Sequence, residues 1–315
     1  MARSTRYVSS PFTSTGRPAS SGFRQVNTAD NFSPSDVSAV VCTLNSVASI
    51  ERCLVSLREA GVGEIIVVDA RSSDGTQEIA SRYADQILED PGTGLGNARN
   101  IGIAESTKSL VLNMGSDNVL PAGQLDLMIE TLEIGSYDGV SARTRIEGTN
   151  YPSRGLNAWR KGRFRPGPAP VIGTPTLFRG DLLRANPYDP TRIFSDDSEL
   201  CERWSREFGA TFAISEAEVL EVGKTSWGEV KTRCRMYGIS DEEIFRIESP
   251  TWSPKRKGQS LLHPARVDLF TPLIHLDPRE SVATFPFLLS FSTMRYAAWI
   301  HTASKRIGSR KKDAS

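Results

Sequence analysis

The sequence has little excess of either charge: 38 Lys and Arg side chains stand against 37 Asp and Glu side chains in 315 residues, a formal net charge of +1. This balance gives no global attraction for nucleic acid, so any basic binding site must be local. Cysteine is also scarce, and the four cysteines lack the spacing of metal ligands. We therefore expect reduced cysteines in the core and no nucleic-acid partner.

Long apolar runs are missing as well. The N-terminus has no apolar segment followed by a cleavage site, so we expect no signal peptide and a cytoplasmic location. Residues 282–303 are apolar and aromatic but contain Pro286 and Arg295, whereas a membrane-spanning helix needs about 20 uninterrupted apolar residues. Basic residues follow at Lys305, Arg306, Arg310, Lys311 and Lys312. Two interpretations stay open for residues 282–312: a peripheral helix on the inner face of an anionic membrane, or a helix packed on the domain with a solvated tail.

The first 36 residues lack any apolar period. They are rich in Ser, Thr, Arg and Gly, which is typical of a disordered lead. The rest of the chain is long enough for one large domain or two smaller ones.

The clearest structural pattern lies at residues 64–76, which read EIIVVDARSSDGT. Four consecutive β-branched residues, Ile65 to Val68, are typical of a parallel strand buried on both faces. Asp69 follows at the carboxyl end, where open parallel sheets bind their ligands. The alternative is that Asp69 merely ends the strand, since loops after strands are often polar.

The neighbouring segments predict an α/β fold. A strand over 37–44, a helix over 47–60 and the strand at 65–69 form a crossover that makes the two strands parallel. Further strands are expected at 86–88 and 110–114. Asp117 follows the last of these, so Asp69 and Asp117 should face one crevice.

Glycines at 92, 94 and 96 open a predicted helix that carries Arg99. Glycines before a helix can bring backbone N–H groups close to phosphate, and Arg99 adds further donors. A dinucleotide fingerprint would follow the first strand, whereas these glycines follow the third, which weakens an NAD interpretation.

Two later segments have alternative interpretations. Residues 148–175 are rich in Gly and Pro, with basic and aromatic residues, and form either a solvated irregular loop or a mobile flap over phosphate. Single-stranded nucleic acid ranks lower, because no basic surface extends this segment. The sequence FSDDSEL at 194–200 opens a predicted helix; its acids favour the helix dipole, but capping alone would not need so many.

Five motifs occur in an order that resembles the family 2 glycosyltransferases with the GT-A fold, over residues 37–237. The motifs are VVCTLN at 40–45, VDARSSDGT at 68–76, ARNIG at 98–102, Asp117 before Pro121, and DDSEL at 196–200. The resemblance implies a Rossmann-like, mostly parallel sheet flanked by helices. It divides the chain into a lead at 1–36, a glycosyltransferase domain at 37–240 with nucleotide-binding half 37–121 and acceptor half 122–240, and a C-terminal helical extension at 241–315.

The resemblance also implies roles for residues of the donor site. Asp69 would hold the nucleotide base, with Thr43 and Asn45 lining the same pocket. Arg99 would lie near the ribose or diphosphate. Arg71 and Asn100 belong to the same motifs and are assigned to the nucleotide-sugar site with them.

A divalent ion and a general base complete the implied site. Asp117 matches the second acid of the family's DxD motif and would bind Mg²⁺ or Mn²⁺, which neutralises the departing diphosphate. Gly115 stands where the first acid is usual, so Asp117 alone, with Asn118 assisting, would hold the metal. Asp197 matches the second acid of the ED motif and would take the proton of the acceptor hydroxyl in an inverting single displacement.

The chain lacks the QxxRW sequence of the processive synthases of this family. We therefore expect a hexosyltransferase-type enzyme that adds one sugar to a glycan or lipid-linked acceptor in cell-envelope polysaccharide synthesis. One alternative is a catalytically degenerate nucleotide-sugar-binding protein, prompted by Gly115. The other is a nucleotidyltransferase, which would carry a Gly-rich, basic signature after the first strand instead of TLN at 43–45.

Overall fold

The computed structural model describes residues 31–192 and 196–312. Residues 1–30 of the predicted lead, and Phe194 and Ser195 of the acidic motif, lie outside the described residues. The predicted start of order at Val37 is a few residues late. Pro34–Asp36 form a short 3₁₀-helix, η1, and the backbone N–H of Phe32 donates to Glu133 Oε1 at 2.7 Å. Phe32 also packs against the core, which fixes this segment.

The described residues form one sheet of nine strands, ordered β3-β2-β1-β4-β8-β6-β9-β5, with β7 beside β9. The bounds are β1 Val37–Thr43, β2 Glu64–Asp69, β3 Gln86–Glu89, β4 Leu110–Gly115, β5 Asn118–Val119, β6 Gly139–Ile146, β7 Gly167–Ala169, β8 Thr176–Arg179 and β9 Phe212–Glu221. Strands β1 to β4 are parallel, β6 and β9 are parallel to each other, and β8 runs antiparallel between β4 and β6. The predicted α/β fold with a mostly parallel sheet is confirmed.

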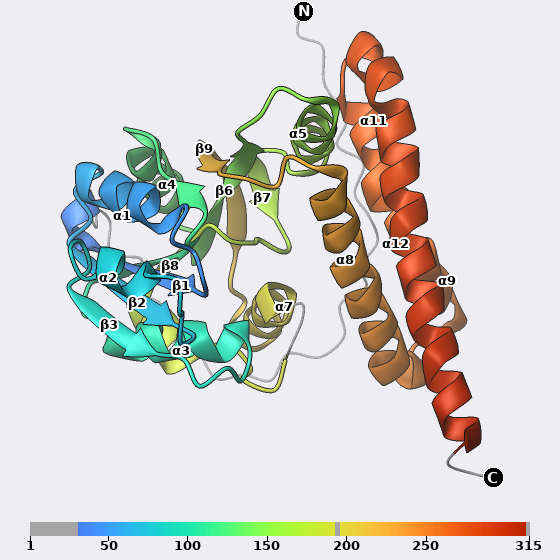
Figure 1. The fold of residues 1–315 in the computed structure, drawn as a ribbon, viewed down its shortest axis with the longest axis horizontal. Helices are drawn as coiled ribbons and strands as arrows, with labels where there is room; N and C mark the ends of the chain where they lie inside the picture. Colours follow the sequence, from blue (N-terminus) through green and yellow to red (C-terminus); the bar gives the residue numbers. More distant parts are fainter. Residues whose placement is uncertain (1–30, 193–195, 313–315) are drawn as a thin grey trace, which may run out of the picture. The chain divides into compact units, whose positions relative to one another are not determined.

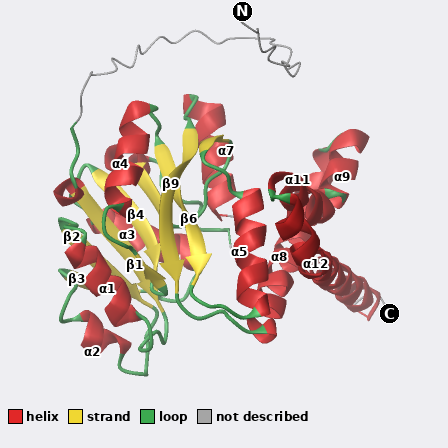
Figure 2. Cartoon of the chain, turned by 90° about the horizontal axis from the view of Figure 1, so that it is seen from above, coloured by secondary structure: helices red, strands yellow, loops and turns green. Residues whose placement is uncertain are grey.

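Helices cover the sheet and continue beyond it (Figures 1 and 2). The bounds are α1 Ile50–Glu59, α2 Thr76–Ala80, α3 Leu95–Glu105, α4 Gln124–Ile134, α5 Tyr151–Arg163, α6 Gly180–Ala185, α7 Asp196–Phe208, α8 Trp227–Glu248, α9 Pro254–Leu261, α10 His263–Ala265, α11 Thr271–His275 and α12 Pro278–Lys312. Short irregular turns are η2 Ser249–Thr251 and the π-helical η3 Arg266–Phe270.

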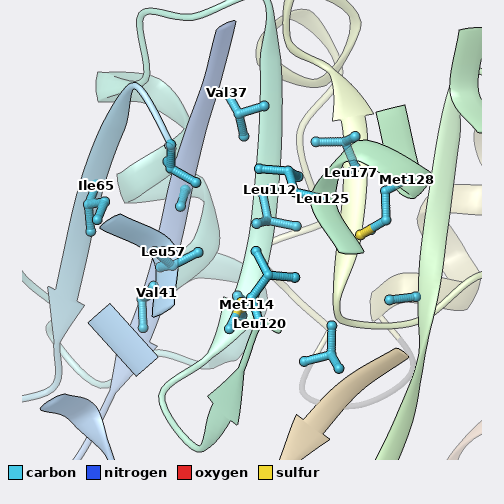
Figure 3. Close-up of a cluster of buried hydrophobic side chains, with 14 of the residues drawn as sticks. Val37, Val41, Leu57, Ile65, Leu112, Met114, Leu120, Leu125, Met128 and Leu177 are labelled. Carbon is cyan, nitrogen blue, oxygen red and sulfur yellow. The ribbon is translucent and has the colours of Figure 1, made fainter. Parts of the chain in front are cut away.

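Alternate residues of the central strands pack into two separate cores, because successive side chains of a strand point to opposite faces of the sheet. Val41 and Val67 join the cluster under α1 and α4, part of which Figure 3 shows. Val40 and Val68 point the other way, into the cluster under α3, α6 and α7. Because both faces are covered, these strands read as unbroken apolar runs, and the prediction of buried parallel strands is confirmed.

The interpretation of residues 148–175 as an irregular loop or flap is wrong. Tyr151–Arg163 form helix α5, whose N-cap Asn150 accepts a hydrogen bond from the Ser153 N–H at 3.0 Å. The helix buries Leu156 and Trp159 against α8 and α12. Gly and Pro in this stretch obscured the helix because its apolar face packs on residues more than 70 positions further along the chain.

The C-terminal helices pack closely on one another and on α5. Side chains of α5, α8 and α12 share a third cluster that contains Trp159, Phe287 and Phe291. Gly238 on α8 has no room for a side chain, because a Cβ there would lie 2.5 Å from the Arg295 carbonyl oxygen. Helix α8 runs from Trp227 to Glu248, so the predicted domain boundary at 240 falls inside it.

Two further observations concern the end of the sheet and the C-terminal helix. Residues 212–221 form one continuous strand, β9, whose partner β6 shifts register between Ser141 and Arg143. In the described ranges, no helix has both the length and the apolar character needed to cross a bilayer.

Candidate active site

The predicted donor residues lie at the carboxyl edge of the parallel strands. Thr43 at the end of β1 pairs in register with Asp69 at the end of β2. Gly115 at the end of β4 pairs in register with Cys42 of β1. The chain therefore brings the ends of three strands to one edge, as the sequence predicted, and Asp117 follows two residues beyond Gly115.

Asp69 is fully buried and orders the loop between β2 and α2. Its carboxylate accepts hydrogen bonds from the Ser72 N–H at 2.9 Å, the Ser72 hydroxyl at 2.5 Å and the Gln77 amide at 2.6 Å. Three donors are enough to compensate for burying the charge. Contact between Asp69 and a nucleotide base stays a prediction.

The neighbouring donor-site residues differ in the hydrogen bonds and ion pairs that they make. Asn45 links the loops after β1 and β2, because its N–H donates to Ser72 Oγ and its side-chain oxygen accepts from the Ser73 N–H. Thr43 Oγ1 is buried with no hydrogen-bond partner among the described residues. Arg71 makes an exposed ion pair with Glu89 at 2.6 Å. Thr43 is thus the member of this group that has an unused polar atom.

Arg99 is the centre of a buried polar cluster. Its Nη1 donates to Asp196 Oδ2 at 2.6 Å and to Asp197 Oδ1 at 3.1 Å, and its Nη2 donates to Thr174 Oγ1 at 2.7 Å. The guanidinium also lies over the ring of Tyr188, 5.1 Å from the centroid. Helix α3 therefore holds the N-terminus of α7 through Arg99.

Asp197 is placed by two elements that the sequence did not connect. The Tyr188 hydroxyl donates to Asp197 Oδ1 at 3.3 Å, and Asn100 holds the Tyr188 backbone through two hydrogen bonds of 2.8 and 3.0 Å. Burial raises the pKa of Asp197, while Arg99 opposes this shift. A carboxylate with a raised pKa is a better proton acceptor than a free one. Sequence reasoning missed Tyr188, which lies in an irregular stretch without a motif.

Two cavities meet at the contact between Arg99 and Asp197. A cleft of about 1460 Å³ is lined by α5, α8 and the C-terminal helices, and Asp197 lies on its wall. A small cavity of about 60 Å³ is lined by Arg99 and Gly115, and Thr174 borders both cavities. The small cavity is large enough for water but far too small for a sugar.

Asp117 does not line either cavity. Its carboxylate forms an ion pair with Lys224 Nζ, which also contacts Glu221 at 2.6 Å. That Asp117 and Asp197 share one pocket stays a prediction. Sequence reasoning also missed Lys224, whose only signal was a basic residue after Gly223 at the end of the last strand.

The residues around Asp117 do not fit a divalent cation. The expected helper, Asn118, uses its side-chain oxygen to accept the Gly115 N–H at 3.1 Å. A Cβ at residue 115 would lie 2.9 Å from Asp117 Oδ1, so the space of a first acid is filled. In the described part of the chain, no group of three or more His, Cys, Asp or Glu side chains is placed to hold a metal. Asp117, paired with an ammonium group, is a weak site for Mg²⁺ or Mn²⁺.

Glu221, Arg160 and Arg233 extend this ion pair into the protein. Arg160 Nη2 contacts Glu221 Oε2, and Arg233 Nη2 donates to Oε1 at 2.8 Å. Burial opposes ionisation of Glu221, but the three cations outweigh it and lower the pKa of its carboxyl group. Arg160 also lines the large cleft, and its Nη1 is buried without a hydrogen-bond partner in the part of the chain that the structure describes.

Comparisons with known proteins match the part of the chain that contains the predicted donor-site residues. Residues 38–186 match the family described as Glycosyl transferase family 2. An uncharacterized glycosyltransferase of Mycobacterium tuberculosis is 31% identical over 117 residues, which cover 37% of this chain and 52% of that protein. The succinoglycan biosynthesis protein ExoO of Rhizobium meliloti is 32% identical over 126 residues, 34% of this chain and 36% of that protein. The chain thus spans about half or less of the length of these relatives.

Solved structures with a related chain path have low sequence identity. Staphylococcus aureus TarS 1-349 in complex with UDP-GlcNAc has a TM-score of 0.48 and 16% identity, and the match covers 86% of this chain and 92% of that chain. GalNAc-T7 with UDP, GalNAc and Mn²⁺ has a TM-score of 0.49 and 13% identity, over 70% of this chain and 53% of that one. The family resemblance inferred from the motifs is confirmed by the family match, whose range ends before Asp197.

Proposed function

We propose, from the premise that residues 38–186 form a glycosyl transferase family 2 domain, that the chain is an inverting hexosyltransferase. It moves one sugar from a nucleotide-diphosphate sugar to a hydroxyl of a glycan or lipid-linked acceptor. Succinoglycan biosynthesis, in the name of one relative, supports a role in polysaccharide synthesis. The observation that carries the proposal is the position of Asp197 on the wall of the large cleft, in contact with Arg99 beside the small cavity.

Asp197 acts as general base in the proposed reaction. It takes the proton of the acceptor hydroxyl while the oxygen forms a bond to the anomeric carbon. The bond from that carbon to the diphosphate oxygen breaks, its electron pair stays on the nucleoside diphosphate, and the anomeric configuration inverts. Asp197 is suited to this role because burial raises its pKa while a face of the side chain still borders the cleft.

The donor occupies the carboxyl edge of the sheet. Thr43, Asn45 and Asp69 line the base, and the Thr43 hydroxyl, which has no partner among the described residues, is available for a hydrogen bond. Arg99 faces the diphosphate, because it lines the small cavity together with Gly115. A sugar that reaches the small cavity lies beside Arg99, which in turn contacts Asp197.

The acceptor occupies the cleft between α5, α8 and the C-terminal helices. Arg160 Nη1 is its anchor, because it is buried with no partner in the described ranges, and such an N–H gains most from an oxygen that accepts its hydrogen bond. Aromatic side chains also line the cleft, among them Tyr151 and Trp252. Flat apolar surfaces beside hydrogen-bond donors suit a sugar or a lipid-linked sugar.

A donor panel tests the proposal. Thermal-shift measurements with nucleotide-diphosphate sugars of uridine, guanosine, cytidine and thymidine should raise the melting temperature for at least one of them, because a ligand that binds the native state stabilises it. The same donor should release nucleoside diphosphate in the presence of acceptor. Binding without any turnover would favour the degenerate sugar-nucleotide-binding protein, and no binding across the panel would contradict both.

We also propose that the C-terminal helix contacts an anionic membrane surface from the cytoplasmic side. Val282, Phe285 and Leu289 are exposed at helical spacing on one face of α12, with 77%, 45% and 45% of their surface accessible. The opposite face carries Phe287 and Phe291, which are buried against α5 and α8. An exposed apolar stripe followed by the basic Lys305 is typical of a helix that lies on lipid.

Vesicle flotation tests the membrane contact. The chain should float with vesicles that contain phosphatidylglycerol and less well with pure phosphatidylcholine, because the basic end prefers anionic lipid. Replacing both Phe285 and Leu289 with Ser should reduce flotation by removing apolar area. The control, Ile134→Ser on α4, removes an apolar side chain that is more exposed, at 79%, but lies elsewhere, and should leave flotation unchanged. Equal flotation of all three proteins would reject this surface.

A further inference from the structure

Lys224 is fixed beside Asp117 by backbone contacts on both sides. The Val222 N–H donates to the Asp117 carbonyl oxygen at 2.8 Å, and the Lys224 N–H donates to Glu229 Oε1 at 3.0 Å. Lys224 has a φ of 57°, an uncommon conformation for a residue with a side chain. The turn after β9 is therefore held in one geometry, and that geometry brings the ammonium group to Asp117.

The ammonium group of Lys224 has a donor to spare. It carries three N–H donors. Glu221 Oε1 accepts one at 2.6 Å and Asp117 Oδ2 accepts another, and no third partner occurs among the described residues. The Lys224 side chain is 41% exposed, so the remaining N–H is accessible to a ligand.

The carboxylates around Lys224 are shared with other donors. Glu221 is already contacted by Arg160 and Arg233, so it does not need the full charge of Lys224. Glu229 also lies close, because its Oε1 accepts the Lys224 N–H, so three cations face three carboxylates. Lys224 lies next to the Asp117 loop, at the strand edge where the donor diphosphate is proposed to bind.

We propose that Lys224 takes the place that the sequence assigned to a divalent cation, and binds the diphosphate of the donor directly. The inference rests on the proposed function. A metal ion at Asp117 would be repelled by the adjacent ammonium group, and the missing acid at Gly115 leaves it too few ligands. Donor binding therefore requires Lys224 and no metal.

Lys224 also stabilises the transition state in this scheme. When the bond between the anomeric carbon and the diphosphate oxygen breaks, the electron pair and its charge stay on that oxygen. A preorganised ammonium group stabilises this charge without reorientation. The proton of the acceptor still goes to Asp197, so Lys224 keeps its own protons throughout.

Calorimetry of the full chain with UDP, GDP, CDP and dTDP as probes tests the proposal. Each is titrated in EDTA and again in Mn²⁺. At least one should bind equally well in both. Lys224→Gln should weaken that binding about 10- to 100-fold, the range expected for a lost charged hydrogen bond. Lys231→Gln, a nearby exposed lysine on α8 without an ion pair in the described ranges, should leave it unchanged.

The outcomes separate this inference from the proposed function. Binding that needs Mn²⁺, or unchanged affinity in Lys224→Gln, would overturn the role of Lys224 and leave a glycosyltransferase in place. Absence of binding under every condition would contradict the proposed function and with it this inference. Lys224→Arg controls for folding: it keeps the charge and should bind more tightly than Lys224→Gln. A folded Lys224→Arg protein that binds as weakly as Lys224→Gln would contradict the charge-based role.

Discussion

Asp197→Asn is expected to lower the rate of sugar transfer by about 10²- to 10⁴-fold, the usual contribution of a general base. Asn keeps the shape of the side chain and a carbonyl oxygen that can still accept the Arg99 hydrogen bond. It cannot take a proton from the acceptor hydroxyl. Nucleotide binding, measured by calorimetry, should stay nearly intact because Asp196 still pairs with Arg99 at 2.6 Å.

The pH dependence of the same reaction gives a second measurement. Asp197 must be ionised to act as a base, and burial raises its pKa above the ordinary value of 3.8. The value of kcat/KM should therefore fall as the pH drops through this raised pKa, and the Asn variant should lack this limb. Asp181→Asn, at a fully exposed acid on α6, is the matched control and should transfer at the wild-type rate. A fully active Asp197→Asn protein would remove Asp197 from the mechanism.

Glu221→Gln is expected to lower the free energy of unfolding by about 3–5 kcal/mol, because it leaves a buried charge without its partner. Glu221, the last residue of β9, is buried and is contacted by Arg160, Arg233 and Lys224. The neutral amide cannot compensate for the burial of Arg160, which is itself buried. Urea unfolding at pH 7 measures the difference.

A surface pair provides the control for this prediction. Glu216→Gln breaks an exposed ion pair with Arg143 and should cost less than about 1 kcal/mol. The effect of Glu221→Gln should also depend on pH. The folded pKa of Glu221 lies below its ordinary value of 4.5, so its contribution is complete above pH 4.5 and disappears as the pH falls through the folded pKa. Equal stability of the Glu221→Gln and Glu216→Gln proteins would show that the network is not a stabilising feature.

Local pattern was enough to predict the sheet and one part of the site. The apolar run at Ile65 to Val68 predicted a strand buried on both faces, because only a covered parallel strand tolerates such a run. The order of strands and helices then placed Asp69 and the loop of Asp117 at one edge of the sheet. The motifs gave the family resemblance, and residues 38–186 match the model of the same family.

Other features depended on contacts between distant segments, which no local pattern records. Helix α5 was missed because Trp159 gains its partners only from α8 and α12. Tyr188 was missed because Asn100, 88 residues earlier, holds it against Asp197.

The sequence by itself determined the parallel strands β1 to β4 and the chemical types at their carboxyl edge, because hydrophobic periodicity and crossover handedness act over short distances. Tertiary structure alone decided how the charges pair. It brought the Lys224 ammonium group to Asp117, where the motif predicted a metal. It also paired Arg160 with Glu221, although the two residues are 61 positions apart in the chain. Ion pairs form between charged groups that are close in space, and the packing of the helices sets which groups are close.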